Sequence, residues 1–267
     1  MRNRYERQSF LGPKSEATLR SLCVAIVGLG GGGSHIAQQL GHIGVGRFLL
    51  FDPQRIDDTN LNRLVGATEG DVARRAYKTA ITRRLITRVN SAAKVEQFRD
   101  DWKTHALRLR GCDIVIGCVD TYRDRSELEI QARRYHIPYL DIGMDVNALP
   151  SYGHLIGGQV ILSMPGGPCM RCMGFLQESL LAQEAARYGD VGSRPQVIWS
   201  NGLLASTAVG ALIQLFTPWH AAVGAQVYME YDGNTQQLQP SERLKYLPER
   251  CMHFDAEDVG DPWYNLD

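Results

Sequence analysis

A run of glycines and an aspartate in the first fifth of the chain have types and spacing that suit a phosphate-binding turn. Gly28, Gly30 and Gly33 follow the apolar run of residues 22–27 and precede a helical pattern. Such a turn lets the backbone approach a phosphate closely, and the next helix offers it free N–H groups. Asp52 ends the following apolar run, where a carboxylate commonly holds ribose hydroxyls. The pattern predicts a nucleotide site formed by Gly28, Gly30, Gly31, Gly33 and Asp52, without distinguishing NAD from ATP.

Four polar residues further along the chain favour cleavage of ATP. They are Asn60, Arg63, Lys78 and Asp120. Attack on an α-phosphate builds negative charge that Arg63 and Lys78 could stabilise. Asp120 could hold Mg²⁺, which prefers oxygen ligands, and Asn60 could donate to phosphate or ribose. Taken singly, a helical Lys or Arg is usually a solvated charge and a strand-ending Asp is often a helix cap.

The order of these residues resembles the ThiF/MoeB/HesA family, the prokaryotic relatives of ubiquitin-activating enzymes. The resemblance also covers the amino-terminal Arg4-Tyr5-Glu6-Arg7-Gln8. It implies that Asp52 binds the ATP ribose, that Asn60, Arg63 and Lys78 contact the triphosphate, and that Asp120 binds Mg²⁺. It further implies a homodimer in which Arg7 reaches into the partner's ATP site, so that Arg7, Arg63, Lys78 and Asp120 form the catalytic set.

The reaction implied by the resemblance is adenylation of a protein's C-terminal carboxylate, with release of pyrophosphate. The acceptor would be a ubiquitin-like or sulfur-carrier protein, usually ending in Gly-Gly. Many relatives carry a cysteine in a crossover segment, where it takes the activated partner. Residues 189–201 contain no cysteine. We therefore expect adenylation alone, with direct hand-over to another protein such as a conjugating-enzyme-like one, or a covalent step relocated to a cysteine such as Cys172.

The cysteines fall into two groups with different expected roles. Cys169 and Cys172 form a C-x-x-C pair like the first of two pairs that hold structural zinc in the family, while the second pair is replaced by Cys251 and His253. Zinc accepts three cysteines and one histidine. The alternative is a degraded site with reduced loop thiols. The three remaining cysteines, which lie in or beside apolar runs, are expected to be buried thiols: Cys23, Cys112 and Cys118.

Composition excludes several classes of protein. The 267 residues carry 29 Lys and Arg against 29 Asp and Glu, so the balanced charge argues against a nucleic-acid binder. The polar, charged start is unlike a secretory signal, and we expect no apolar run to reach membrane-spanning length. We therefore expect a cytoplasmic protein with no membrane or nucleic-acid partner.

Alternating apolar runs and helical patterns predict the fold. We expect an α/β architecture, a Rossmann-like and mainly parallel sheet flanked by helices, with an elaborated C-terminal half that adds antiparallel strands. Residues 1–267 are expected to form a single adenylation domain. Strands are expected at 22–27, 48–52, 93–98, 113–119, 137–143, within 152–163 and at 227–231, and helices at 34–43, around 72–89, 123–135, 175–188 and 199–216.

Two other functions remain open from sequence. The glycine turn and Asp52 would also suit an NAD-dependent oxidoreductase, although no hydride-transfer acid/base set is evident. The second alternative is a catalytically inactive scaffold that binds a ubiquitin-like partner. Such a scaffold would not need Arg63, Lys78 and Asp120.

Overall fold

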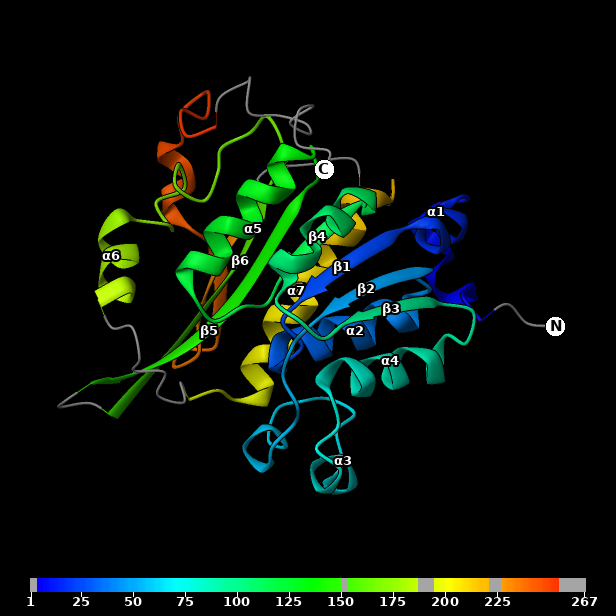
Figure 1. Ribbon diagram of the computed structural model, residues 1–267. Coiled ribbons are helices and arrows are strands. Elements are labelled where there is room, and N and C mark those ends of the chain that lie inside the picture. The colour runs from blue at the N-terminus through cyan, green and yellow to red at the C-terminus, as the bar shows by residue number, and fades with distance from the viewer. Residues whose placement is uncertain (1–3, 150–152, 187–194, 221–226, 255–267) are drawn as a thin grey trace.

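One eight-stranded sheet organises the molecule. The computed structural model describes residues 4–149, 153–186, 195–220 and 227–254 (Figure 1). The strand order is β3-β2-β1-β4-β5-β6-β7-β8. Neighbouring strands run parallel from β3 to β5 and antiparallel from β5 to β8. This confirms the predicted Rossmann-like α/β sheet with antiparallel strands supplied by the C-terminal half.

The elements alternate along the chain in the βαβ manner. The strands are β1 Cys23–Val27, β2 Arg47–Phe51, β3 Lys94–Phe98, β4 Ile114–Gly117, β5 Tyr139–Leu149, β6 Gly153–Ser163, β7 Val227–Asp232 and β8 Gln237–Pro240. The α-helices are α1 Ser15–Ser21, α2 Gly31–Ile43, α3 Glu69–Ala73, α4 Lys78–Val89, α5 Tyr122–Arg134, α6 Glu178–Ala186 and α7 Ile198–Phe216. Short 3₁₀ segments are η1 Glu6–Leu11, η2 Asp58–Asn60, η3 Trp102–Gly111 and η4 Glu242–Tyr246.

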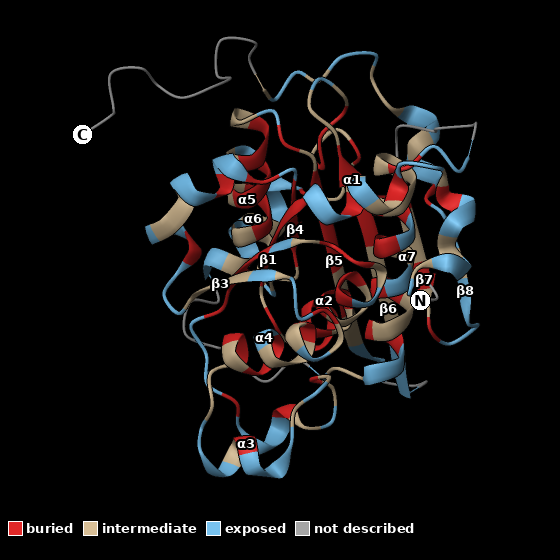
Figure 2. Ribbon diagram, turned by 90° about the vertical axis from the view of Figure 1, so that its right-hand side faces the viewer, coloured by how far each residue is buried: buried red, intermediate tan, exposed pale blue. Residues whose placement is uncertain are grey.

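Both faces of the parallel part are buried, which is why its strands are unbroken apolar runs. Along β1, Val24 and Ile26 belong to the cluster that includes α2 and α7, whereas Ala25 and Val27 belong to the cluster that includes α5 and η3. Figure 2 shows these central strands as buried, with the more exposed helices outside them. The edge where β1, β2 and β4 end is thereby left for the connecting loops.

The helical pattern predicted around residues 72–89 is confirmed by α4, but the chain forms two helices there and not one continuous helix. α3 ends at Ala73, and Arg75 adopts a left-handed backbone with φ 48°. Arg55 and Tyr77 then pair in an isolated antiparallel bridge before α4 begins. The break places Lys78 at the first position of α4, beside the loop that follows β2, instead of in a helix interior. η1, α1, η3 and β8 were not predicted.

α7 also differs from expectation, since its 19 residues are long and apolar enough, by length and composition, to cross a membrane. It is the one helix in the described ranges with that property. Leu204, Ala208 and Leu212 pack into the cluster shared with α2, β5 and β6. We interpret α7 as a core helix.

Candidate functional site

The turn after β1 is open on the side where a phosphate would approach. Gly28 has φ +88°, and a Cβ there would lie 2.4 Å from the Cys118 carbonyl oxygen, so only glycine lets the loops after β1 and β4 close together. A Cβ on Gly30 would meet nothing within 4 Å. α2 begins at Gly31, so the amino end of a 13-residue helix faces this space.

The other predicted loop glycines also have packing reasons. A Cβ on Gly31 would lie 2.5 Å from Nδ2 of Asn201, and one on Gly33 would lie 2.0 Å from the Gly28 carbonyl oxygen. Close contact between α2, α7 and the loop therefore requires small residues at both positions. Whether Gly31 and Gly33 also contact phosphate stays a prediction.

Asp52 ties the glycine turn to the loop after β2. Its Oδ2 accepts the Leu29 N–H at 2.8 Å and its Oδ1 accepts the Gln54 N–H at 2.8 Å. Burial raises the pKa of Asp52, while the Lys78 charge and the two N–H donors oppose that rise and Asp120 adds to it. Electrostatic coupling to both Lys78 and Asp120 shows that all three residues lie at the same edge of the sheet.

Lys78 is a buried cation with a neutral partner. Its side chain is buried, and Nζ donates to Oε1 of Gln54 at 2.5 Å. Among the residues described, no carboxylate oxygen lies within 4.0 Å of this ammonium. A buried charge is costly unless it is paired, so Lys78 is suited to an anionic ligand.

Asn60 and Arg63 belong to the η2 loop, near the same edge. Asn60 is buried, and its Oδ1 has no hydrogen-bond partner within the described structure. A buried polar atom without a partner indicates a ligand or water. Arg63 is half-buried and donates to the Thr59 carbonyl oxygen at 2.7 Å and to Oδ1 of Asn62 at 2.9 Å, which fixes its guanidinium on the loop.

Asp120 lies three residues after the end of β4 and is exposed at the carboxyl end of the parallel strands. Nε2 of Gln196 donates to its Oδ1 at 3.3 Å. A single carboxylate next to a phosphate site suits Mg²⁺, which usually binds one or two carboxylates together with phosphate oxygens and waters. The residues present therefore fit the predicted ion.

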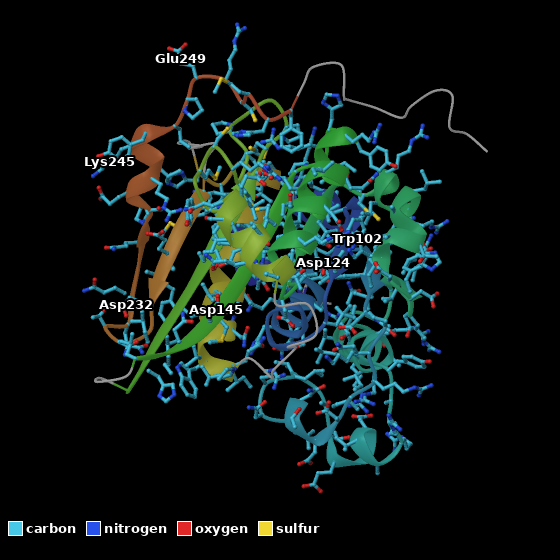
Figure 3. All side chains as sticks on the ribbon, turned by 60° about the vertical axis from the view of Figure 1, so that its left-hand side comes forward. Trp102, Asp124, Asp145, Asp232, Lys245 and Glu249 are labelled. Atoms are coloured by element: carbon cyan, nitrogen blue, oxygen red, sulfur yellow. The ribbon has the colours of Figure 1, made fainter. Side chains whose placement is uncertain are left out.

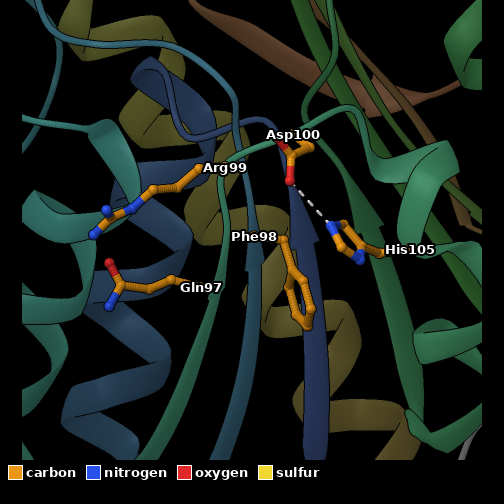
Figure 4. Close-up of a pocket in the computed structure, with 5 residues that line it drawn as sticks. All are labelled: Gln97, Phe98, Arg99, Asp100 and His105. Carbon is orange, nitrogen blue, oxygen red and sulfur yellow. Dashed lines mark hydrogen bonds and ion pairs between the residues drawn. The ribbon is translucent and has the colours of Figure 1, made fainter.

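A shallow hollow of about 430 Å³ adjoins this edge at the end of β3 (Figure 4). It is lined by Gln97, Phe98, Arg99, Asp100 and His105. The Phe98 carbonyl oxygen accepts the Asp52 N–H at 3.1 Å, so the hollow is one hydrogen bond from the proposed ribose ligand. The sequence did not predict a role for these residues. Their position at and after the end of β3, the strand next to β2, could have indicated that they lie near the nucleotide site.

Arg125 and Asp141 form a second feature that sequence analysis missed. Both are buried, and Nη1 of Arg125 is ion-paired with Asp141 and donates to the Ile142 carbonyl oxygen at 3.2 Å. Tyr139 also donates to Asp141, at 3.0 Å. The pair joins α5, which begins just after Asp120, to β5. A lone aspartate within the apolar run 137–143 was the available signal.

Arg7 does not join the site of its own chain. It is exposed on η1, whose neighbours Arg4 and Gln8 donate to the carbonyl oxygens of Val89 at 2.6 Å and Ile43 at 3.0 Å. These carbonyls are at the carboxyl ends of α4 and α2, whereas the nucleotide-binding groups are at the amino ends. The length of α2 corresponds to about 20 Å. Arg7 therefore lies away from the candidate site of its own chain, and its role in a partner's site stays a prediction.

Cys169, Cys172, Cys251 and His253 converge at the turn after β6, and their ligand atoms all lie within 4.8 Å of one another. The Sγ atoms of Cys169 and Cys172 are 3.7 Å apart, and Nδ1 of His253 is 3.5 Å and 3.3 Å from them. Zn–S bonds of about 2.3 Å at tetrahedral angles place sulfurs about 3.8 Å apart. The set therefore fits zinc. The segment with Lys245 and Glu249 leads to Cys251 along the outer side of the sheet (Figure 3).

Comparison with known proteins identifies the family. The model of the ThiF family matches residues 3–251. The chain belongs to the ThiF family. It is 30% identical over 175 residues to mouse "Adenylyltransferase and sulfurtransferase MOCS3", covering 64% of this chain and 36% of the relative. It is 29% identical over 175 residues to the "SAMP-activating enzyme E1" of Haloferax volcanii, covering 64% and 61%.

Solved structures share the fold at lower identity. Escherichia coli MccB with ATP superposes with a TM-score of 0.73 at 20% identity, covering 90% of this chain and 71% of that one. This likeness concerns the fold alone. The chain spans 36% to 61% of the length of the first curated relatives it matches, so the activity of the whole protein is a proposal.

Proposed function

We propose that this ThiF-family chain binds MgATP and adenylates the C-terminal carboxylate of a ubiquitin-like or sulfur-carrier protein, releasing pyrophosphate. The observation that carries the proposal is the buried Lys78, paired with a neutral amide beside a glycine turn and Asp52. A triphosphate supplies the missing negative charge. Relatives named as a ThiS adenylyltransferase and as MOCS3 support the reaction class.

Each residue has a distinct role in this proposal. Asp52 accepts the ribose hydroxyls, and the base lies toward the hollow beside Phe98. Lys78 and Arg63 stabilise the charge that grows when the partner's carboxylate attacks the α-phosphate. Asp120 would hold Mg²⁺, which would supply positive charge to the departing pyrophosphate. A partner ending in Gly-Gly suits the reaction because no side chain blocks its approach to the nucleotide.

The assembly in this proposal is a cytoplasmic homodimer that carries structural zinc. Arg7 of one chain completes the partner's site, since it lies at the far end of α2 from its own. Cys169, Cys172, Cys251 and His253 hold the zinc, which ties the C-terminal segment to the turn after β6. Residues 187–194 lie outside the described residues, and residues 189–201 lack a cysteine. We therefore propose hand-over of the adenylate to another protein, such as a conjugating-enzyme-like one.

ATP–pyrophosphate exchange tests this function. With a sulfur-carrier protein ending in Gly-Gly, the wild-type chain should exchange pyrophosphate, and Asp120→Ala should reduce exchange by roughly 100-fold or more because the Mg²⁺ ligand is lost. Glu242→Ala, an exposed carboxylate change on η4, serves as the control. Normal exchange by folded Asp120→Ala would contradict the role of Asp120. Absence of exchange with every Gly-Gly carrier, despite ATP binding, would contradict the function.

A further inference from the structure

Two buried cysteines outside the proposed site lie side by side. Cys23 is the first residue of β1, and Cys112 follows η3. Their Sγ atoms are 3.8 Å apart, and both residues are less than one tenth exposed. Neither belongs to the cysteine–histidine cluster proposed for zinc, and neither has a part in the proposed adenylation.

Hydrogen bonds between Asp113 and Cys23 hold the two cysteines side by side. The Asp113 N–H donates to the Cys23 carbonyl oxygen at 2.8 Å, and the Cys23 N–H donates to Oδ2 of Asp113 at 2.7 Å. These bonds fix the chain immediately after Cys112 against the start of β1. A disulfide requires an S–S distance of about 2.05 Å. The sulfurs must therefore approach by roughly 1.8 Å, which side-chain rotation and a small shift of the η3 end can supply.

We propose that Cys23 and Cys112 are an oxidisable dithiol that closes to a reversible disulfide in the presence of a peroxide. In the first step the Cys23 thiolate attacks one peroxide oxygen and the O–O bond breaks, which gives a sulfenic acid and, after protonation, water. In the second step the Cys112 sulfur attacks the Cys23 sulfur, the S–O bond breaks and a second water leaves. Two thiols and one hydrogen peroxide thus give one disulfide and two waters.

The local charges assign the order of attack. A hydrogen bond with Cys112 lowers the pKa of Cys23, and the Arg47 charge acts in the same direction against the effect of burial. The same hydrogen bond and burial raise the pKa of Cys112. Cys23 is therefore the more readily deprotonated of the two and is assigned to meet the oxidant, and Cys112 is the resolving thiol.

The disulfide would covalently link β1 to the segment that leads into β4, at the amino ends of both strands. The nucleotide-binding groups lie at the carboxyl end of β1, beyond Val27. Oxidation should therefore raise stability while leaving ATP binding in place. The loop closed by the bond runs from residue 23 to residue 112, which is long enough for a large loss of unfolded-state entropy.

Peptide mapping tests the proposal on the full chain. After treatment of reduced protein with hydrogen peroxide, non-reducing digestion that cleaves before Asp113 should yield a Cys23–Cys112 crosslinked peptide free of Cys118. The melting temperature should rise by about 5 °C or more and return after a phosphine reductant. Cys118→Ser is the matched control, because it should still form the crosslink, whereas Cys23→Ser and Cys112→Ser should not.

Two results would overturn the proposal. One is the absence of a Cys23–Cys112 peptide in wild-type protein after its half-buried thiols have been consumed. The other is accumulation of sulfinic acid on Cys23 with Cys112 still a free thiol. Both are read on the wild-type chain, so they do not depend on the folding of a variant.

Discussion

At the scale of single residues, three charged side chains, those of Asp52, Lys78 and Asp120, lie at one edge of the sheet, and the other two affect the ionisation of Asp52. Asp52 is buried and its pKa is raised by that burial, while Lys78 opposes the rise and Asp120 adds to it. Asp52 accepts hydrogen bonds from two N–H donors, and no carboxylate oxygen among the described residues lies within 4.0 Å of the Lys78 ammonium. The ammonium is therefore left to interact with a ligand.

Replacement of Lys78 by Met tests this interpretation, since it removes the charge and keeps most of the stem. We expect the dissociation constant for ATP to rise by roughly 100-fold, because a charge-assisted contact with phosphate is lost. The melting temperature without ATP should stay the same or increase, because a buried charge without a carboxylate partner is removed. Calorimetry and thermal melts measure both quantities. Arg83→Met, an exposed change on the same helix, should leave both unchanged; equal ATP affinity in the two variants would contradict the assignment.

The sequence predicted Asp52 and Asp120 after two strands of a parallel sheet, and both lie at the same edge of that sheet, while the roles of Asp52, Asn60, Lys78 and Asp120 stay predictions. It did not reveal the hollow beside Phe98 or the Arg125–Asp141 pair. Those depend on contacts between β2 and β3 and between α5 and β5, which are neighbours in space but separated along the chain. Periodicity in one segment carries no information about such contacts.

At the scale of elements, Asp71 fixes the segment between β2 and α4. Asp71 is buried and forms a capping box with Thr68, the N-cap residue of α3. Its carboxylate also accepts two hydrogen bonds from Arg84 on α4, at 2.7 Å and 2.6 Å. The hydrogen bonds from Arg84 hold the pKa of Asp71 well below the ordinary carboxyl range. Nη2 of Arg84 also donates to the Gly66 carbonyl oxygen at 2.9 Å, so the pair ties the segment that follows Asn60 and Arg63 to α4.

Asp71→Asn should destabilise the protein by about 2–3 kcal/mol at pH 7. Because the folded-state pKa of Asp71 is depressed, its contribution is present above the unfolded pKa of about 3.9 and is lost as the pH falls toward the folded value. The difference in unfolding free energy between wild type and variant should therefore shrink between about pH 5 and pH 3. Denaturant titrations at several pH values measure it. A difference independent of pH would show that the charge is not the cause, and Asp58→Asn provides an exposed control.

The turn after β6 gives a second prediction at this scale. Purified protein should contain about one zinc per chain, and a strong chelator should lower the melting temperature because metal binding adds to folding free energy. His253→Ala should lose the metal, whereas His253→Cys should retain it, since zinc also accepts four cysteines. Met252→Ala is the neighbouring control. Metal analysis that finds zinc in His253→Ala at the wild-type level would exclude His253 as a ligand.

The elements themselves were largely predictable. Strands buried on both faces are continuous apolar runs, so β1, β2 and β4 were located from sequence, as was α7. The break between α3 and α4 was not, because it depends on the left-handed Arg75 and on pairing of Arg55 with Tyr77. None of these three residues is a glycine or proline, the residue types that usually indicate a helix break in a sequence.

At the scale of the whole molecule, the position of η1 requires a second chain if Arg7 acts in catalysis. η1 packs against the carboxyl ends of α2 and α4, at the opposite end from the phosphate-binding turn. We therefore expect a homodimer with two composite sites.

Mixed dimers test this arrangement. Arg7→Ala and Asp120→Ala should each be nearly inactive in pyrophosphate exchange. A purified mixed dimer of the two should regain about one half of the wild-type rate, because one of its two sites has both residues. Gel filtration and mixed-tag purification establish that the mixed dimers form. If such dimers are isolated and remain inactive, Arg7 does not act across the interface.

The most direct test of the proposed adenylation is the intact mass of the carrier protein after incubation with the chain, MgATP and inorganic pyrophosphatase. We expect a carrier that ends in Gly-Gly with a free carboxylate to gain the mass of one adenylate, and the same carrier with an amidated C-terminus to stay unchanged. The adduct should be absent with Asp120→Ala. Adenylation of the amidated carrier, or ATP hydrolysis with no carrier adduct under any of these conditions, would contradict the account.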